Sequence, residues 1–368
     1  MVGERFTVDA GPIAHGGSCV ARVGEAGGRV VFTRHALPGE RVVVEITEGT
    51  EGDRFWRGDA VEVLVPSSDR VSPPCLVAGP GGCGGCDFQH VSLPAQRRLK
   101  AEVVSEQLRR LAGLDVAVEV EAAALEDTGL RWRTRVRYAS TPDGRRGMRR
   151  YRSHEVIPVE DCLLARQDAR EPGLGEVVER VATAMGEHDF TVAADGFWQV
   201  HPAAPAVLVE AVLDQLRPRA GERAVDLYAG VGLFSAFLAD RLGEDGSVLA
   251  VEADRTAARH AAANLAGRAG CNVVCAPAAR AEVDGLVDLV VLDPPREGAR
   301  RAVVERVCAW RPRAASYVAC DPAALARDLA IFAEHGYRLT ALRVFDLFPM
   351  THHVECVALL TKSGSDLR

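Results

Sequence analysis

The sequence lacks a run of apolar residues long enough to cross a membrane, which takes about 18 residues. Its N-terminus, MVGERFTVDA, lacks the apolar stretch of a secretory signal peptide. In a protein that is not exported, ten cysteines are not expected to form a disulfide framework. We therefore expect a cytoplasmic protein without a membrane partner, whose cysteines have another role.

The chain also lacks an excess of positive charge. Its 368 residues carry a net charge of −7, which argues weakly against a nucleic-acid partner. One stretch departs from this balance, because RWRTRVRYASTPDGRRGMRRYR (131–152) holds nine arginines against one aspartate. Arginines that alternate with Trp132, Tyr138 and Tyr151 suit phosphate contacts and base stacking in RNA. The alternative is a solvated, exposed hairpin.

The composition, 48% hydrophobic and 26% charged, is typical of a globular chain with two or three domains. Residues 1–66 contain five short alternating stretches separated by glycine-rich turns, which predict a small OB-like barrel. Residues 67–195 are predicted as a central α+β domain. Its expected elements are a loop at 67–92, a helix at 93–112, strands within 115–162, a helix at about 166–189 and a hairpin at 190–200.

Residues 196–368 are predicted as a third, α/β domain. After a helix at 202–216, strands alternate with helices, which predicts a mostly parallel Rossmann-like sheet with helices on both faces. The last two strands are separated only by FPMTHH (348–353), so they should pair antiparallel. The expected strands are 224–229, 247–253, 272–276, 287–293, 315–320, 339–348 and 354–362.

The turn after the first of these strands reads DLYAGVGLFS. Gly230 and Gly232 fit part of a dinucleotide-binding fingerprint, but Ser235 stands where the third glycine would be. Asp226 precedes them, and a carboxylate there suits a cationic amino-acid group and repels a pyrophosphate. The pattern favours S-adenosylmethionine over NAD as the cofactor.

Two further strand ends carry acidic residues. Glu252 ends the second strand, where an acidic side chain accepts hydrogen bonds from the ribose of either cofactor. The fourth strand ends in LDPPREG, whose paired prolines stiffen the turn and direct Asp293 into the site. Arg296 stands where a methyltransferase acting on amino groups would usually carry an aromatic residue, so amino-group chemistry is disfavoured.

Four motifs now stand in order: DLYAGVG, LDPPREG, YVACDP and DLFPMTHHVE. With these motifs the chain resembles the bacterial RNA uracil-5-methyltransferase family, which makes 5-methyluridine in tRNA or ribosomal RNA. The resemblance covers almost the whole chain. It implies a TRAM-type barrel at the N-terminus, a cysteine cluster and a class I methyltransferase domain.

The resemblance implies that Cys320 is the nucleophile and Glu355 the base. Carbon 5 of uracil is a poor nucleophile, and a thiolate that adds to carbon 6 turns the ring into an enolate that can accept the methyl group. A base must then remove the proton from carbon 5 so that the thiolate can leave. Asp293 would hold the uracil edge or the donor. The implied contacts to S-adenosylmethionine are Gln199, Tyr228 and Glu252.

These assignments have alternatives. Cys320 could be a buried strand residue and Glu355 a charge on an edge strand. Asp321 follows the cysteine where the family often has asparagine, and an ionised aspartate close by would raise the pKa of the thiol. Met350 replaces a more usual polar residue. The alternative functions are a non-catalytic RNA-binding protein that keeps the fold, and a methyltransferase that acts on another base.

A cysteine cluster is predicted in PPCLVAGPGGCGGCDFQH, which has the spacing C-x7-C-x2-C, together with one cysteine after the arginine-rich stretch. Its members are Cys75, Cys83, Cys86 and Cys162. Four thiolates can bind zinc or an iron–sulfur cluster, and the spacing alone leans to zinc. The ribosomal-RNA branch of the family implies a structural [4Fe-4S] cluster and favours 23S rRNA as the substrate. We expect the other cysteines to be packing residues and the protein to be a monomer.

Overall fold

The computed structural model describes residues 1–24, 28–123 and 128–362. The chain forms two compact units, each built from separate segments. Unit 1 comprises Met1–Val103, Glu126–Glu171 and Phe348–His353. Unit 2 comprises Val104–Leu125, Pro172–Leu347 and Val354–Arg368. The predicted central domain is therefore divided between the two units, and six residues from near the C-terminus belong to unit 1.

Unit 1 begins with a five-stranded sheet in the order β1-β4-β5-β3-β2. Its strands are β1 (Arg5–Asp9), β2 (Cys19–Val23), β3 (Arg29–Arg34), β4 (Arg41–Glu48) and β5 (Phe55–Val65). The alternation seen in the sequence places Val31, Val42 and Val44 in a core that is fully buried. The five predicted strands are confirmed.

The rest of unit 1 is less regular. The predicted helix at 93–112 is confirmed as α1 (Leu93–Gln107) followed by a single π-helical turn, η1 (Leu108–Ala112), which continues into unit 2. The arginine-rich stretch forms short strands in two small sheets, β10-β9-β8 and β11-β7. Their bounds are β7 (Arg133–Arg135), β8 (Ala139–Ser140), β9 (Arg146–Arg149), β10 (Val156–Pro158) and β11 (Ala165–Arg170).

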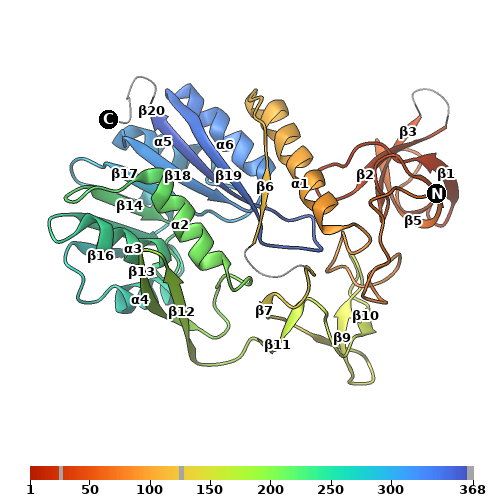
Figure 1. Ribbon diagram of the computed structural model, residues 1–368, viewed down its shortest axis with the longest axis horizontal. Helices are drawn as coiled ribbons and strands as arrows, with labels where there is room; N and C mark the ends of the chain where they lie inside the picture. Colours follow the sequence, from red (N-terminus) through yellow and green to blue (C-terminus); the bar gives the residue numbers. More distant parts are fainter. Residues whose placement is uncertain (25–27, 124–127, 363–368) are drawn as a thin grey trace. The chain divides into compact units, whose positions relative to one another are not determined.

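Unit 2 is built on an eight-stranded sheet in the order β16-β15-β14-β17-β18-β20-β19-β6 (Figure 1). The seven predicted strands are confirmed as β14 (Arg223–Leu227), β15 (Ser247–Glu252), β16 (Cys271–Cys275), β17 (Leu289–Leu292), β18 (Ala314–Ala319), β19 (Tyr337–Asp346) and β20 (Glu355–Lys362). The last two pair antiparallel, as predicted. The eighth strand, β6 (Val120–Ala122), lies within 115–162, where strands were predicted, but its pairing with β19 was not predicted, because nothing in three residues so far upstream indicates their partner.

The strand order reverses direction after β16, and this reversal creates the ligand site typical of such sheets. The crossovers from β14 to β16 run one way and those from β17 to β18 the other. Right-handed crossovers then place α3 (Leu233–Leu242) and α4 (Arg255–Asn264) on one face, and α5 (Arg300–Trp310) and α6 (Pro322–Glu334) on the other. The adjacent carboxyl ends of β14 and β17 form the switch point where ligands bind.

The helix predicted at about 166–189 is wrong. This region forms the end of β11 and an antiparallel hairpin of β12 (Glu176–Thr183) and β13 (Gly186–Ala193), followed by α2 (Ala204–Leu216). Pro172 and Gly175 interrupt any helix, and Gly186 supplies the positive φ of 142° at the turn. The valines of EVVERVAT also favour a strand.

Candidate active site

The first site element is the turn between β14 and α3. Asp226 is completely buried, and its Oδ2 accepts a hydrogen bond of 2.6 Å from the Ser235 hydroxyl, which ties the start of α3 to the strand. Its Oδ1 is buried without a hydrogen-bond partner among the described residues. Burial raises the pKa of Asp226 to about 7, the Ser235 hydrogen bonds lower it, and nearby Glu252 adds to the rise.

The glycines of this turn leave room above the strand ends. Tyr228, Gly230 and Gly232 all have positive φ, at 64°, 56° and 91°. A Cβ added at Gly230 would meet no atom within 4 Å, so the space beside it is open. Glu252, at the end of the neighbouring strand β15, accepts hydrogen bonds from the backbone N–H groups of Gly230 (2.8 Å) and Asp254 (2.7 Å). These contacts hold the carboxylate beside the turn, where it can accept ribose hydroxyls.

The proposed nucleophile and base face each other across two neighbouring strands. β18 and β20 are antiparallel, with Ala319 opposite Cys356. Extending this register by one residue places Cys320 opposite Glu355, and directly opposed residues share one face with Cβ atoms about 5 Å apart. Cys356 lies on the other face and is fully buried, as expected for a packing residue.

Charges around this pair perturb both groups. The pKa of the Cys320 thiol is raised to about 12, first by burial and then by the charges of Glu355 and Asp293. Burial also raises the pKa of Glu355 well above its usual range, with a contribution from Asp293. Arg296 lowers the pKa of both Cys320 and Glu355. Arg296 was not predicted as a site residue, although its place directly after the two prolines of LDPPREG is a signal in the sequence.

Hydrogen bonds to Asp328 of α6 hold the loop that carries Asp293 and Arg296. The buried Asp328 carboxylate accepts hydrogen bonds from the N–H groups of Ala299 (2.7 Å) and Arg300 and from the Tyr317 hydroxyl (2.6 Å). A Cβ at Gly298 would lie 2.6 Å from Asp328 Oδ2, so only glycine fits there. Tyr317 stands three residues before Cys320, so the Asp328 carboxylate connects the LDPPREG motif with the YVACDP motif.

Asp321 has a structural role that the sequence did not predict. Its carboxylate accepts a 2.8 Å hydrogen bond from the N–H of Ala324 and caps the N-terminus of α6. It raises the pKa of Cys320 less than Glu355 and Asp293 do. Gln199 lies partly buried between β13 and α2, and its contact to a methyl donor stays a prediction.

Comparisons with known proteins show the family to which this chain belongs. The model of the TRAM domain matches residues 1–63, and that of the tRNA (uracil-5-)-methyltransferase family matches residues 283–363. An uncharacterized RNA methyltransferase of Streptomyces coelicolor is 45% identical over 100% of this chain and 95% of its own. The 23S rRNA (uracil(1939)-C(5))-methyltransferase RlmD of Chromohalobacter salexigens is 32% identical over 95% of this chain and 88% of its own. This chain belongs to the RNA uracil-5-methyltransferase family.

A solved structure confirms the fold of this RNA uracil-5-methyltransferase. The tRNA (uracil-54, C5)-methyltransferase of Pyrococcus abyssi, in complex with S-adenosyl-L-homocysteine, matches with a TM-score of 0.71 and 20% identity. The match covers 97% of this chain and 100% of the other. In the described part of the chain, no helix is long and apolar enough to cross a membrane.

The four cysteines predicted to bind a metal in this methyltransferase lie in one part of unit 1. The pKa of Cys86 is raised to about 12, chiefly by burial, and Cys162, Cys83 and Cys75 are near enough to contribute to the rise. No three Cys, His, Asp or Glu side chains of the described residues are grouped tightly enough to hold a metal ion. The cluster therefore stays a prediction.

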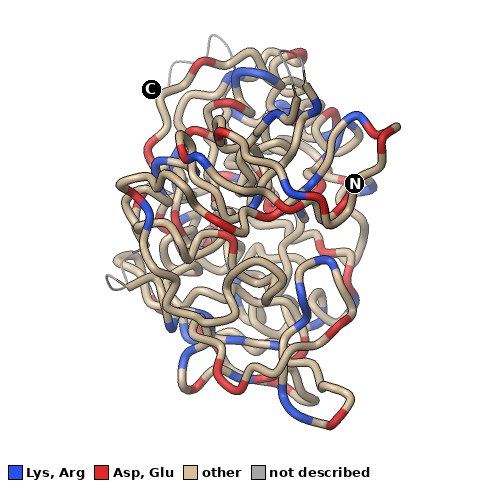
Figure 2. Tube along the Cα trace, turned by 90° about the vertical axis from the view of Figure 1, so that its right-hand side faces the viewer, with Lys and Arg blue, Asp and Glu red and all other residues tan. Residues whose placement is uncertain are grey.

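The arginine-rich stretch of this methyltransferase is less free than its composition indicates. Figure 2 shows acidic positions interspersed with basic ones along the chain. Arg131, Arg145, Arg150 and Arg152 form ion pairs with carboxylates of unit 1. Trp132 is only 5% exposed, so the prediction that it stacks on RNA bases is wrong.

The two tyrosines of the stretch differ from Trp132. Tyr151 is 37% exposed, and the Arg34 guanidinium lies 3.4 Å from the centre of its ring. The Arg146 guanidinium lies 4.1 Å from the centre of the Tyr138 ring. Arg137 and Arg149 are also exposed, and their contact to phosphates stays a prediction.

Proposed function

We propose that this protein transfers a methyl group from S-adenosylmethionine to carbon 5 of a uridine in RNA. The observation that carries the proposal is the pairing of Cys320 and Glu355 at the carboxyl edge of the sheet, beside the glycine turn and the LDPPREG loop. Methylation of a carbon that is not itself nucleophilic requires this combination of thiol, carboxylate and donor site.

In the proposed reaction the Cys320 thiol gives its proton to solvent water, and the thiolate sulfur forms a bond to carbon 6 of the uracil. The electron pair of the 5,6 double bond moves toward oxygen 4, and carbon 5 of the resulting enolate takes the methyl group from the sulfonium, which leaves as S-adenosylhomocysteine. Glu355 then removes the proton from carbon 5, the double bond re-forms and the sulfur–carbon bond breaks. The guanidinium of Arg296 stabilises the negative charge that passes through the thiolate and the enolate.

The donor is proposed to bind above the carboxyl ends of β14 and β15. The open space beside Gly230 allows its close approach, Gly232 supplies the positive φ of the turn, and Glu252 accepts the ribose hydroxyls. The buried Asp226 fixes the geometry of the turn by accepting a hydrogen bond from the Ser235 hydroxyl. Gln199 and Tyr228 are proposed as the remaining contacts.

The RNA substrate is proposed to be 23S rRNA, with tRNA as the alternative. The relatives named 23S rRNA (uracil(1939)-C(5))-methyltransferase, from Chromohalobacter salexigens and a Shewanella species, cover 95% and 92% of this chain and support the first choice. The TRAM domain and the exposed arginines of residues 131–152 support RNA binding.

A structural [4Fe-4S] cluster on Cys75, Cys83, Cys86 and Cys162 is proposed, with zinc as the alternative. Two sulfurs already accept N–H donors of the kind that surround metal-bound thiolates, because Gly85 N donates to Cys83 and Gln89 Nε2 donates to Cys86 at 3.2 Å. Protein purified without oxygen should contain about four iron atoms per chain and absorb near 400 nm. A colourless protein with one zinc would contradict the cluster.

The proposed function is tested by the variant Glu355→Gln. With the base removed, the enzyme should stop after methyl transfer, so an RNA–protein adduct should survive a denaturing gel. The double variant Cys320→Ala, Glu355→Gln is the matched control and should form no adduct. Equal methyl transfer by wild type and Cys320→Ala, or tritium label outside 5-methyluridine, would contradict the proposal and favour a different reaction.

A further inference from the structure

The segment before the proposed base is held by backbone hydrogen bonds within unit 1. Met350 has φ of 66°, a left-handed conformation that a side chain rarely adopts and that persists only when the surroundings hold it. Its carbonyl accepts hydrogen bonds from the N–H groups of Asp87 and Phe88, both 3.0 Å. Its N–H donates to Oε1 of Gln96 at 2.8 Å. Three contacts therefore hold the one strained residue of Phe348–His353.

Gln96 is completely buried on α1 and joins this segment to the turn before the helix. Its Nε2 donates to the carbonyls of Phe88 (3.0 Å) and Val91 (2.9 Å). One turn further along α1, Lys100 Nζ donates to the carbonyl of Phe348 at 3.1 Å. No water can replace these contacts at a site without solvent access, so removing the amide leaves buried groups unpaired.

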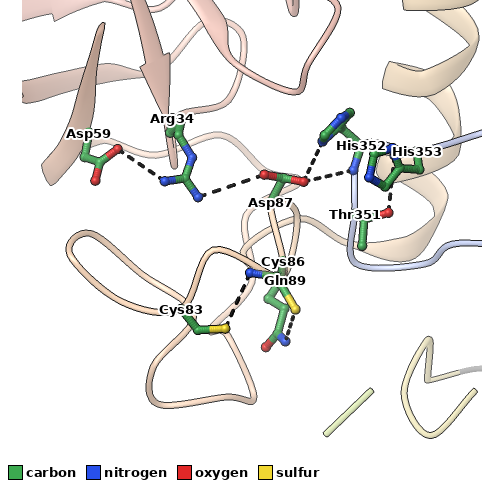
Figure 3. A network of polar contacts seen from close by, with 10 residues as sticks. Arg34, Asp59, Cys83, Cys86, Asp87, Gln89, Thr351, His352 and His353 are labelled. Atoms are coloured by element: carbon green, nitrogen blue, oxygen red, sulfur yellow. Dashed lines mark hydrogen bonds and ion pairs between the residues drawn. The ribbon is translucent and has the colours of Figure 1, made fainter. Parts of the chain in front are cut away.

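Asp87 makes a second connection, drawn in Figure 3. Its Oδ2 lies 2.6 Å from Nδ1 of His352 and accepts the His352 N–H at 3.3 Å. Arg34, from β3 of the barrel, lies 3.9 Å from the other oxygen of Asp87. A Cβ added at Gly17 would lie 2.7 Å from Cβ of His352, so the barrel closes directly against this histidine.

Asp87 directly follows Cys86, the last cysteine of the loop. Gln89 holds this loop together, because its Nε2 donates to the Cys86 sulfur at 3.2 Å and its Oε1 accepts the N–H of Cys75 at 3.0 Å. A continuous set of hydrogen bonds therefore runs from the cysteine loop through Asp87 to the segment that ends at His353.

Only Val354 separates this segment from Glu355. At its other end the segment continues β19, and Glu355 is the first residue of β20. Residues 348–353, which unit 1 holds, therefore lead directly into the strand that carries the base, whose first residue also pairs with Phe345 of β19. Proton transfer requires hydrogen-bond distance between base and proton, and a displacement of about 1 Å reduces such a rate roughly a hundredfold.

We propose that Asp87 and Gln96 are positioning residues for the base Glu355, so that the cysteine loop and α1 control the release of the methylated RNA. The inference rests on the proposed function. It concerns the last chemical step, removal of the carbon 5 proton with cleavage of the sulfur–carbon bond. Attack by Cys320 and methyl transfer come before that step and do not use Glu355.

The test compares two RNA substrates in single-turnover reactions. With uridine, Asp87→Ala and Gln96→Met should accumulate the covalent adduct and form product roughly ten- to a hundredfold more slowly than wild type. With 5-fluorouridine, carbon 5 carries no removable proton, so every variant with an intact nucleophile should form the adduct at the wild-type rate. Asp87→Asn keeps an acceptor for His352 and should restore most of the product rate.

Asp69→Ala is the matched control, because Asp69 is a partly exposed aspartate of unit 1 whose side chain pairs with Arg98. It should behave as wild type. Wild-type product rates in both Asp87→Ala and Gln96→Met would overturn the inference, as would a loss confined to RNA affinity or a slower reaction with 5-fluorouridine. If the wild type itself forms neither product nor 5-fluorouridine adduct, the proposed function fails instead.

Discussion

Replacing Asp226 by asparagine removes a carboxyl group that is completely buried at the base of the donor turn. Its pKa is raised from 3.8 to about 7, chiefly by burial. The folded state therefore binds the proton more tightly than the unfolded state. Stability from this group is fully present below the unfolded pKa and is lost as the pH rises through the folded value.

The size of the effect follows from the shift. Each pKa unit corresponds to about 1.4 kcal/mol, so between pH 5 and pH 8 the wild type should lose about 2 to 3 kcal/mol of unfolding free energy through Asp226. Asparagine cannot ionise and should escape this loss. Its free energy of unfolding, relative to that of the wild type, should therefore increase by the same amount over this interval.

Urea denaturation of ligand-free protein at the two pH values measures the difference. Asp245→Asn, at an exposed aspartate of unit 2, is the matched control and should show little pH-dependent change. A difference between Asp226→Asn and wild type that is the same at both pH values would refute the reasoning. It would mean that the carboxyl group ionises as easily in the folded as in the unfolded chain.

Three further predictions concern the neighbouring motifs. Asp321→Ala removes the cap of α6 and should cost about 1 kcal/mol of unfolding free energy, whereas Asp321→Asn keeps the cap. Thiol titration of Asp321→Asn should show only a small fall in the pKa of Cys320. A large fall would contradict the finding that Asp321 raises this pKa less than Glu355 and Asp293 do. The pKa of the Cys320 thiol is raised to about 12, chiefly by burial, and Glu355 must also lose its proton before it can act as a base. The measured kcat/KM should therefore rise from about pH 7 to pH 9. A value that falls over this range would argue against a thiolate nucleophile. Gly298→Ala places a methyl group 2.6 Å from Asp328 Oδ2. Thermal denaturation should show a loss of about 1 to 3 kcal/mol of unfolding free energy, and kcat should fall. Unchanged stability and kcat would show that the loop can move without consequence.

Most of unit 2 was predictable because its signals are local. β14, β15 and β17 are short apolar runs that end in a glycine turn or an acidic residue, and these ends meet at one edge of any such sheet. The error at 166–189 has the opposite cause. In that region the hairpin depends on pairing between β12 and β13, and the prediction gave too little weight to Pro172, Gly175 and the valines of EVVERVAT.

The chemistry-bearing residue types and their order along the chain were determined locally, which is why Asp226, Glu252, Asp293, Cys320 and Glu355 could be named from motifs. The proximity of these residues was not determined locally, because it depends on the register of β18 against β20 and on a strand order that pairs distant segments. Only the tertiary structure brought Arg296 near the thiol and placed Asp87 against the segment before the base. Contacts between residues hundreds of positions apart leave no periodic trace in a sequence, because packing and hydrogen bonding select them after the local elements have formed.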